Sequence, residues 1–212
     1  MAPDREEGPP DTELVRRFCE GDEGAFATLV RRHERRVYNL AYRMIGRPED
    51  ARDATQEAFL SCYRHLGAFR GDSSFTTWIH RITVNACYDI LRKKAPVLAS
   101  AEEQLEPPPA PDHADAAADA VDVQRALLDV PAEFRSVLVM HDVQGLPYEE
   151  IAQALGVPLG TVKSRLHRAR VALGRSLSRR GEPREPGAPS NPRTLRGTGA
   201  PGQPMHGAVE AT

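Results

Sequence analysis

Residues 146–173 read LPYEEIAQALGVPLGTVKSRLHRARVAL, a pattern that predicts two helices joined by a tight turn. Pro147 and Pro158 suit the first turn of a helix, where a backbone N–H has no helical partner, and Gly156 suits the end of the first helix. The apolar contacts between the two helices are expected from Ile151, Leu155, Val157, Val162 and Leu166. The stretch therefore predicts a helix-turn-helix unit, an arrangement whose second helix enters the major groove of DNA.

The second helix of this pair has two faces of opposite character. On a helical wheel its buried face collects Val162, Leu166, Ala169 and Leu173. The opposite face and its edges collect polar and basic side chains, namely Thr161, Lys163, Ser164, Arg165, His167, Arg168 and Arg170. We expect Ser164, His167 and Arg168 to face base edges, and Lys163 to serve either a base or a phosphate. We expect Arg165 and Arg170 to hold phosphates.

Charges of opposite sign are segregated along a chain whose formal net charge is only -2. Residues 12–95 hold 15 Lys or Arg against 11 Asp or Glu, and residues 95–124 hold seven acids and no base. Residues 151–181 then hold seven bases and no acid, whereas an ordinary solvated helix mixes signs to form i,i+4 ion pairs. This asymmetry favours a polyanionic partner, and a merely solvated basic helix remains the alternative.

The other patterned stretches also predict helices, because strand-like alternation is almost absent. Four helices are expected before the acidic segment and four after it, over about 12–19, 22–46, 48–67, 73–94, 121–128, 131–143, 147–155 and 158–177. The sequence thus predicts an all-α fold of two small helical domains joined by a flexible acidic linker.

The division of the chain follows from its composition. We expect a disordered N-terminus over 1–11, a first domain over 12–95, an acidic Pro/Ala linker over 96–120, a second domain over 121–180 and a disordered tail over 181–212. The linker contains three consecutive prolines and the tail is rich in Pro and Gly, so neither buries enough apolar surface to offset its ordering entropy. The linker is therefore expected to be a mobile tether.

Several classes of protein are excluded by the composition. The longest apolar run, Val137–Met140, is far shorter than the roughly 20 residues that span a bilayer, and the first residues lack an export signal, so we expect a cytoplasmic protein without membrane insertion. Cys19, Cys62 and Cys87 lie far apart, which argues against a disulfide scaffold or a zinc site and favours buried packing. No metal-ligand cluster, phosphate loop or nucleophile–base pair has a recognisable spacing, so we expect no metal, no cofactor and no enzyme.

Two motifs of the first domain have features that helix packing alone does not require. Residues 53–59 read DATQEAF and place Asp53, Gln56 and Glu57 on one exposed stripe of a helix, beside Phe59 as an apolar anchor. Taken alone, such a stripe is most often an ordinary polar helix surface.

The second motif is an aromatic turn. Residues 69–78 read FRGDSSFTTW and lead into a helix that bears Arg81, Asn85 and further bases. Aromatic side chains beside bases can stack on or cradle unpaired nucleotides. For Phe75 and Trp78 individually, a place in a small-domain core is the better interpretation.

Together these residues resemble the extracytoplasmic-function group of the sigma-70 family, the smallest bacterial RNA polymerase sigma factors. The resemblance covers about residues 12–177. It rests on four motifs in family order and spacing: DATQEAF (53–59), FRGDSSFTTWIHRITVN (69–85), LPYEEIA (146–152) and GTVKSRLHRAR (160–170). It implies that the first domain is sigma region 2, that the second is sigma region 4, and that no region 3 domain lies between them.

The resemblance also implies a role for each motif. The residues implied to dock on the largest subunit of core RNA polymerase are Asp53, Gln56, Glu57 and Phe59. Those implied to hold an extruded base of the minus-10 element are Phe69, Arg70, Gly71, Asp72, Ser73, Ser74, Arg81 and Asn85. Those implied to read the minus-35 duplex are Thr161, Lys163, Ser164, Arg165, His167, Arg168 and Arg170. The family sometimes has an aromatic residue at position 167, so the resemblance does not say which promoters are recognised.

The function implied by the resemblance is that of a promoter-specificity subunit. Such a protein binds core RNA polymerase through its largest and beta subunits, reads the minus-35 duplex, and melts and captures the minus-10 strand. The family also implies control by an anti-sigma factor. The acidic linker is expected either to mimic nucleic acid in the polymerase or to act only as a soluble tether. A free-standing helix-turn-helix regulator is the alternative, and it leaves the motifs at 53–59 and 69–85 unexplained.

Overall fold

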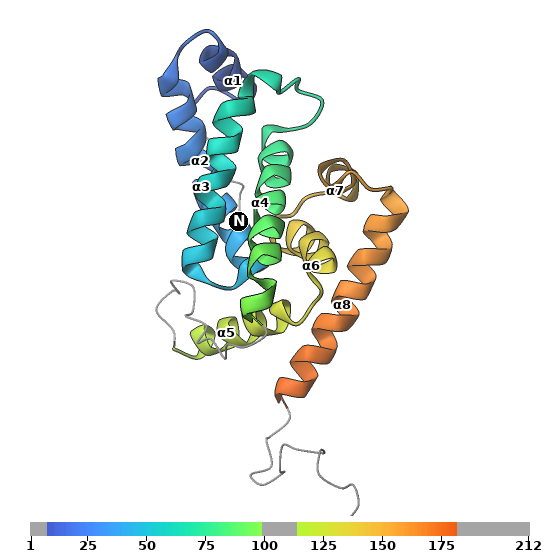
Figure 1. Ribbon diagram of the computed structural model, residues 1–212. Helices are drawn as coiled ribbons and strands as arrows, with labels where there is room; N and C mark the ends of the chain where they lie inside the picture. The colour runs from blue at the N-terminus through green and yellow to red at the C-terminus, as the bar shows by residue number, and fades with distance from the viewer. Residues whose placement is uncertain (1–7, 99–113, 182–212) are drawn as a thin grey trace, which may run out of the picture. The chain divides into compact units, whose positions relative to one another are not determined.

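The computed structural model describes residues 8–98 and 114–181, and Figure 1 shows these residues as a set of packed helices. The first block consists of α1 (Asp11–Cys19), α2 (Glu23–Ile45), α3 (Pro48–His65) and α4 (Phe75–Leu98). The second block consists of α5 (Ala114–Leu128), α6 (Ala132–Leu138), α7 (Tyr148–Leu155) and α8 (Leu159–Gly181). A 3-10 turn (Leu66–Ala68) follows α3, and a π-helical turn (Val139–Val143) follows α6. Because no strand occurs in the described ranges, the predicted all-α fold is confirmed.

The predicted stop and start signals act at the helix ends. Gly46 ends α2 with φ 84° and Gly156 ends α7 with φ 63°, the left-handed conformation that glycine adopts without strain. Pro48 occupies the first turn of α3. Ser74 caps α4, because its Oγ accepts a hydrogen bond of 3.1 Å from the backbone N–H of Thr77.

The first helix begins inside the segment expected to be disordered. Asp11 starts α1, and its carboxylate binds Nε2 of His33 at 2.8 Å as well as the guanidinium of Arg32. These two partners on α2 fix the beginning of α1.

The two helices beside the predicted linker are longer than expected. The start of α5 is Ala114 rather than residue 121, because five of the residues 114–120 are alanine, the best helix former. The end of α4 is Leu98, past the expected end near residue 94. Residues 1–7, 99–113 and 182–212 lie outside the part that the structure describes, so the disorder expected there stays a prediction.

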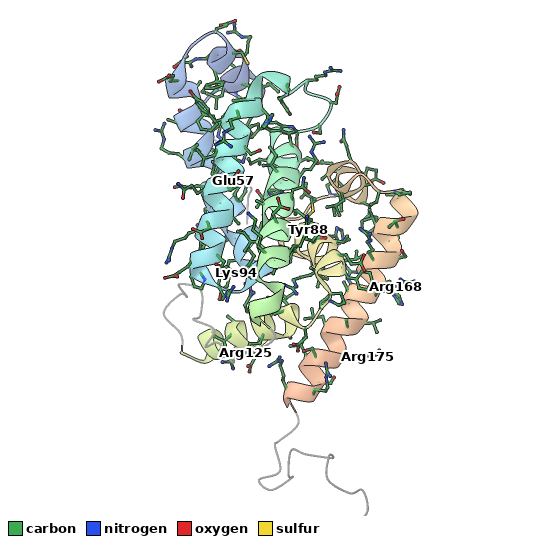
Figure 2. All side chains as sticks on the ribbon, viewed as in Figure 1. Glu57, Tyr88, Lys94, Arg125, Arg168 and Arg175 are labelled. Carbon is green, nitrogen blue, oxygen red and sulfur yellow. The ribbon has the colours of Figure 1, made fainter. Side chains whose placement is uncertain are left out.

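Two apolar clusters form the interior. One joins α1, α2, α3 and the start of α4 through side chains that include Leu14, Leu29, Ala58, Cys62, Phe75 and Ile79. The other, the shared core, joins α2 and α4 to the second block and includes Leu40, Met44, Ile45, Val137, Met140, Leu146, Ile151 and Val162. Polar contacts accompany the shared core, since Tyr88 of α4 donates to Oγ of Ser136 on α6 at 2.8 Å (Figure 2). The second block therefore packs directly on the first.

A buried guanidinium donates hydrogen bonds to backbone carbonyls at the end of α5. Arg135 is 6% exposed and donates to the carbonyl oxygens of Leu128 at 2.8 Å and Val130 at 2.9 Å. It also donates to the carbonyl of Met44 in the first block. Burial lowers the pKa of Arg135 to about 10, so the group remains charged at neutral pH.

Arg135→Met is expected to lower the free energy of unfolding by about 3 kcal/mol, because three buried carbonyls lose a charged donor and an unsatisfied buried group costs about 1–3 kcal/mol. Urea unfolding followed by circular dichroism measures this change. Arg125→Met is the matched control, since Arg125 is exposed and lies 3.9 Å from Asp122, its ion-pair partner. Equal effects of the two changes would contradict the role given to Arg135.

Candidate nucleic-acid interface

One face of α3 presents the side chains expected to meet a protein partner. Asp53, Gln56 and Glu57 are all exposed, and Figure 2 shows Glu57 on α3. Leu60 and Tyr63 share this face at helical spacing, and their exposed fractions of 42% and 46% are high for apolar side chains. Neither residue belongs to the set predicted from the sequence, although both lie on the same side of a helical wheel as Asp53. The face therefore combines acidic groups with an apolar centre.

Phe59 lies beside the stripe, on the side of α3 that faces the core. Its ring is only partly exposed and packs against the core of the first block, because its helical position is turned away from Asp53. Asp53 and Glu57 instead line a groove of about 420 Å³ between α3 and α4, and Lys93 lies on the opposite wall. The α3 wall of the groove is acidic, whereas the α4 wall carries Asp89 as well as Lys93 and Lys94.

A small cavity lies where residues 69–74, the aromatic loop, meet α4. Its volume is about 150 Å³, and its lining includes Phe69, Trp78 and Arg81. The ring of Trp78 lies 5.4 Å from that of Phe69 and 5.9 Å from that of Phe75, measured between centroids. Phe75 is only 2% exposed and belongs to the core, which is the place expected for it from the sequence. Trp78 is half-buried and forms part of the cavity wall.

The aromatic loop brings most of the predicted minus-10 residues together. It bends at Gly71, whose φ of 76° is strained for any residue with a Cβ atom. The cavity is lined by Phe69, Arg70, Gly71, Asp72, Ser73 and Arg81 of the predicted set. Asn85 is exposed one helical turn beyond Arg81 and is not part of this lining. Gln153 and Ala154 of α7 complete the wall, a contribution from the second block that the sequence pattern did not indicate.

The helix-turn-helix forms as predicted. Ala152 accepts a 3.1 Å hydrogen bond from the backbone N–H of Val157, which closes the turn between α7 and α8. Val162, Leu166 and Ala169 are buried on the inner face of α8. This packing fixes the rotation of α8 and turns its basic face outward.

The predicted DNA-reading residues fall into two groups on α8. Lys163, Ser164, His167 and Arg168 are exposed. Arg168, labelled in Figure 2, lies with its guanidinium 5.8 Å from the centroid of the Phe134 ring, a cation–π distance. These side chains are available to a ligand in the structure as it stands.

The two arginines expected to hold phosphates are engaged by acids of the second block. Arg170 binds both carboxylate oxygens of Asp142, at 2.6 and 3.1 Å, and this hydrogen bonding raises the pKa of Arg170. Arg165 lies 3.4 Å from Oε2 of Glu133. Both pairs must open before these guanidinium groups can bind phosphate. Thr161, the remaining residue of the predicted set, is half-buried at the start of α8.

The basic face of α8 continues past the predicted segment. Arg175 and Arg179 are exposed and follow Arg168 by seven and eleven positions, which places the three on one side of the helix. Figure 2 shows Arg168 and Arg175 along α8. Both arginines belong to the basic stretch 151–181 but lie outside the set of DNA-reading residues predicted from the sequence.

The described residues hold no group of three or more His, Cys, Asp or Glu side chains that could bind a metal ion. Burial raises the pKa of Cys62 and of Cys87 to about 12, so both thiols remain protonated at neutral pH. Cys19, which was expected to be buried, is exposed because it ends α1. None of the helices in the described ranges is long and apolar enough to cross a bilayer.

Comparison with known families and structures gives concordant matches. Residues 29–96 match the family model described as Sigma-70 region 2, and residues 120–173 match that described as Sigma-70, region 4. The chain is 44% identical over 168 residues to the ECF RNA polymerase sigma factor SigM of Mycobacterium tuberculosis, an alignment that covers 79% of this chain and 84% of SigM.

Two solved structures share the fold. The structure of CnrH in complex with the cytosolic domain of CnrY matches with a TM-score of 0.62 and 27% identity, over 80% of this chain and 97% of that one. The sigma factor RpoE in complex with the anti-sigma factor NepR, from Bartonella quintana, matches with a TM-score of 0.60 and 24% identity, over 72% of this chain and 96% of that one.

Proposed function

Because this chain belongs to the extracytoplasmic-function group of the sigma-70 family, and is thus an alternative RNA polymerase sigma factor, we propose a division of labour between its two blocks. The second block reads the minus-35 duplex through α8. The first block binds core RNA polymerase through the exposed face of α3 and holds the minus-10 strand at the aromatic loop. The protein performs no covalent chemistry and works in the cytoplasm, where its polymerase and promoters are found.

The outward basic face of α8 is the observation that carries this proposal. Buried Val162 and Leu166 fix the helix, so that Ser164, His167 and Arg168 meet base edges in the major groove. Lys163 and the arginines along the helix neutralise phosphates, which gives affinity that falls with salt. Arg165 and Arg170 join these contacts by exchanging their carboxylate partners for phosphate.

The cavity at the aromatic loop is the proposed site for a ring edge of a single unpaired base. A cavity of about 150 Å³ is large enough for one benzene ring in another protein, and here Phe69 and Trp78 supply aromatic walls. Extruding a base from a duplex costs a few kcal/mol, which stacking and hydrogen bonds from Arg81 and the loop backbone offset. Asn85 contacts the strand one turn further along α4.

The exposed face of α3 suits a protein partner better than nucleic acid. Acidic Asp53 and Glu57 would repel phosphates, whereas Leu60 supplies the apolar centre typical of a binding hot spot. We assign this face to the largest subunit of core RNA polymerase, with Gln56 beside Leu60 and Phe59 supporting the face from the core. The beta subunit is the proposed partner of the second block.

An anti-sigma factor is the proposed inhibitor of this protein. CnrH, which is 27% identical to this chain, was solved with the cytosolic domain of CnrY bound to it. An anti-sigma factor that binds this chain would compete with polymerase for the exposed faces of the two blocks.

Run-off transcription with core RNA polymerase tests the proposal. On a template library with varied minus-35 and minus-10 elements, we expect initiation only when this protein is added and only from templates that carry both elements. Sequencing of the transcripts then identifies the promoter. Binding of duplex DNA without initiation, with polymerase from the native host, would instead favour a free-standing regulator.

A further inference from the structure

Helix α6 packs against the part of α8 that carries the proposed DNA-reading residues (Figure 1). Glu133 and Phe134 are neighbours in the first turn of α6, and each contacts an arginine of α8. Glu133 lies 3.4 Å from Arg165, whereas the guanidinium of Arg168 lies over the ring of Phe134. Two adjacent side chains of α6 therefore hold two arginines that are one turn apart on α8, and they do so by different chemistry.

The two contacts differ in what they leave for a ligand. A carboxylate accepts hydrogen bonds from guanidinium N–H groups, so Arg165 must give up Glu133 before it can donate to DNA. An aromatic ring attracts a guanidinium through its charge, and this attraction uses no N–H group. Those N–H groups are the donors that bind the O6 and N7 atoms of guanine in pairs. The contact with Phe134 thus holds Arg168 and leaves its base-reading donors open.

The Phe134 ring is itself fixed in position. It is half-buried and packs against the shared core from the start of α6. The backbone is fixed there as well, because the carbonyl oxygen of Pro131 accepts a 2.9 Å hydrogen bond from the N–H of Phe134. The next residue, Arg135, is buried and donates to backbone carbonyls of both blocks. A shift of the ring away from α8 would therefore disturb the core.

Restraint of Arg168 before DNA binds is useful because an arginine side chain is long and flexible. Ordering one such side chain at an interface costs enough to change affinity by about two- to tenfold. Arg168 is exposed on α8, and its contact with Phe134 keeps the guanidinium 5.8 Å from the ring centroid. Part of the ordering therefore takes place when the protein folds rather than when DNA binds.

We propose that Phe134 is a positioning residue for promoter recognition, whose ring holds Arg168 ready to read a guanine of the minus-35 duplex. This inference rests on the proposed role of α8 as the reader of that duplex. Phe134 acts on a single base contact, through Arg168. Its ring is therefore needed for discrimination at the base pair that Arg168 reads, and not at the pairs read by Ser164 and His167.

Nuclear magnetic resonance of the free full-length protein tests the positioning without DNA. The order parameter of the Arg168 Nε–H bond is expected to exceed about 0.6 in the native chain and to fall below this value, typical of a flexible group, in Phe134→Leu and Phe134→Met. Phe134→Tyr keeps the ring and is expected to keep the native order parameter. Arg175, exposed two turns further along α8, is the internal reference and should not change. An unchanged order parameter of Arg168 in the variants without a ring would overturn the proposal.

Run-off transcription with core RNA polymerase tests the consequence for promoter choice. The templates are the promoter found in the library and versions of it with one minus-35 base pair changed at a time. Arg168→Ala identifies the pair that Arg168 reads, as the pair at which a change no longer lowers transcription. At that pair, the ratio of native to changed promoter is expected to fall about fivefold in Phe134→Leu and to return in Phe134→Tyr. At the other pairs the ratio is expected to stay within about twofold.

A double variant separates positioning from general packing. In the Arg168→Ala background, Phe134→Leu is expected to change transcription by less than about twofold, because the side chain through which it acts is gone. An equal loss in both backgrounds, or a loss of discrimination at every base pair, would show that Phe134 acts through packing and would overturn the proposal. If Arg168→Ala lost discrimination at no pair, the proposed role of Arg168 as a base reader would fail, and the positioning role with it.

Discussion

Arg168→Glu is expected to lower promoter-specific run-off transcription by about 100-fold or more, because one bidentate base contact contributes about 1–3 kcal/mol and a carboxylate in its place also repels the phosphates. Arg168 is exposed on the outer face of α8, where its guanidinium lies over the Phe134 ring. Its replacement removes a cation–π contact of about 0.5–1 kcal/mol, which is small against the stability of a folded domain. The folded protein should therefore survive the change.

Binding of core RNA polymerase separates the roles of the two blocks. Size-exclusion chromatography of the Arg168→Glu variant with core enzyme is expected to give the same complex as the native protein. Arg125→Glu reverses an exposed charge on α5 and serves as the control, with transcription expected to remain near the native level. If Arg168→Glu lost both transcription and polymerase binding, α8 would not be a dedicated promoter reader.

Changes on the exposed face of α3 are expected to weaken polymerase binding itself, unlike Arg168→Glu. The double variant Asp53→Lys, Glu57→Lys should weaken binding to core polymerase by about 100-fold or more, since like charges placed together at an interface cost several kcal/mol. Both side chains are exposed, so the reversal leaves the core of the first block untouched. Transcription should fall with binding and should recover partly at high protein concentration.

Two charge reversals from acidic to basic on α2 provide the control. Glu23 and Glu34 are exposed on that helix, and Glu23→Lys with Glu34→Lys is expected to leave polymerase binding within a few-fold of native. Biolayer interferometry with immobilised core enzyme measures both double variants. Equal losses in the two would mean that net charge, rather than the α3 face, governs association.

The residues at which helices begin and end were predictable where a local sequence signal determines them. Gly46, Pro48 and Gly156 act through their own backbone geometry, and the structure places each at the helix end that the sequence indicated. The start of α1 was predicted to within one residue, but the contacts that fix it were not. Asp11 depends on His33 and Arg32, which lie more than 20 positions further along the chain.

In the candidate site too, features set by local spacing were predictable, and contacts set by packing were not. The buried and exposed faces of α8 follow from helical spacing alone, and the structure reproduces them. The acids that hold Arg165 and Arg170 come from Glu133 and Asp142, and only the packing of the second block brings them close. The contact of Glu150 with Thr77 joins residues 73 positions apart, a separation that no local pattern reports.

The shared core has a consequence for the newly made chain. Leu40, Met44 and Ile45 belong to the first block, yet partners such as Val137 follow about 90 residues later. At ribosomal rates of 5–20 residues per second, this interval lasts roughly 5–18 s. During that time the helices of the first block can form, while the part of their apolar surface that packs on the second block stays uncovered. The nascent protein therefore passes through a stage that invites chaperone binding, and premature termination near residue 98 would release an aggregation-prone fragment.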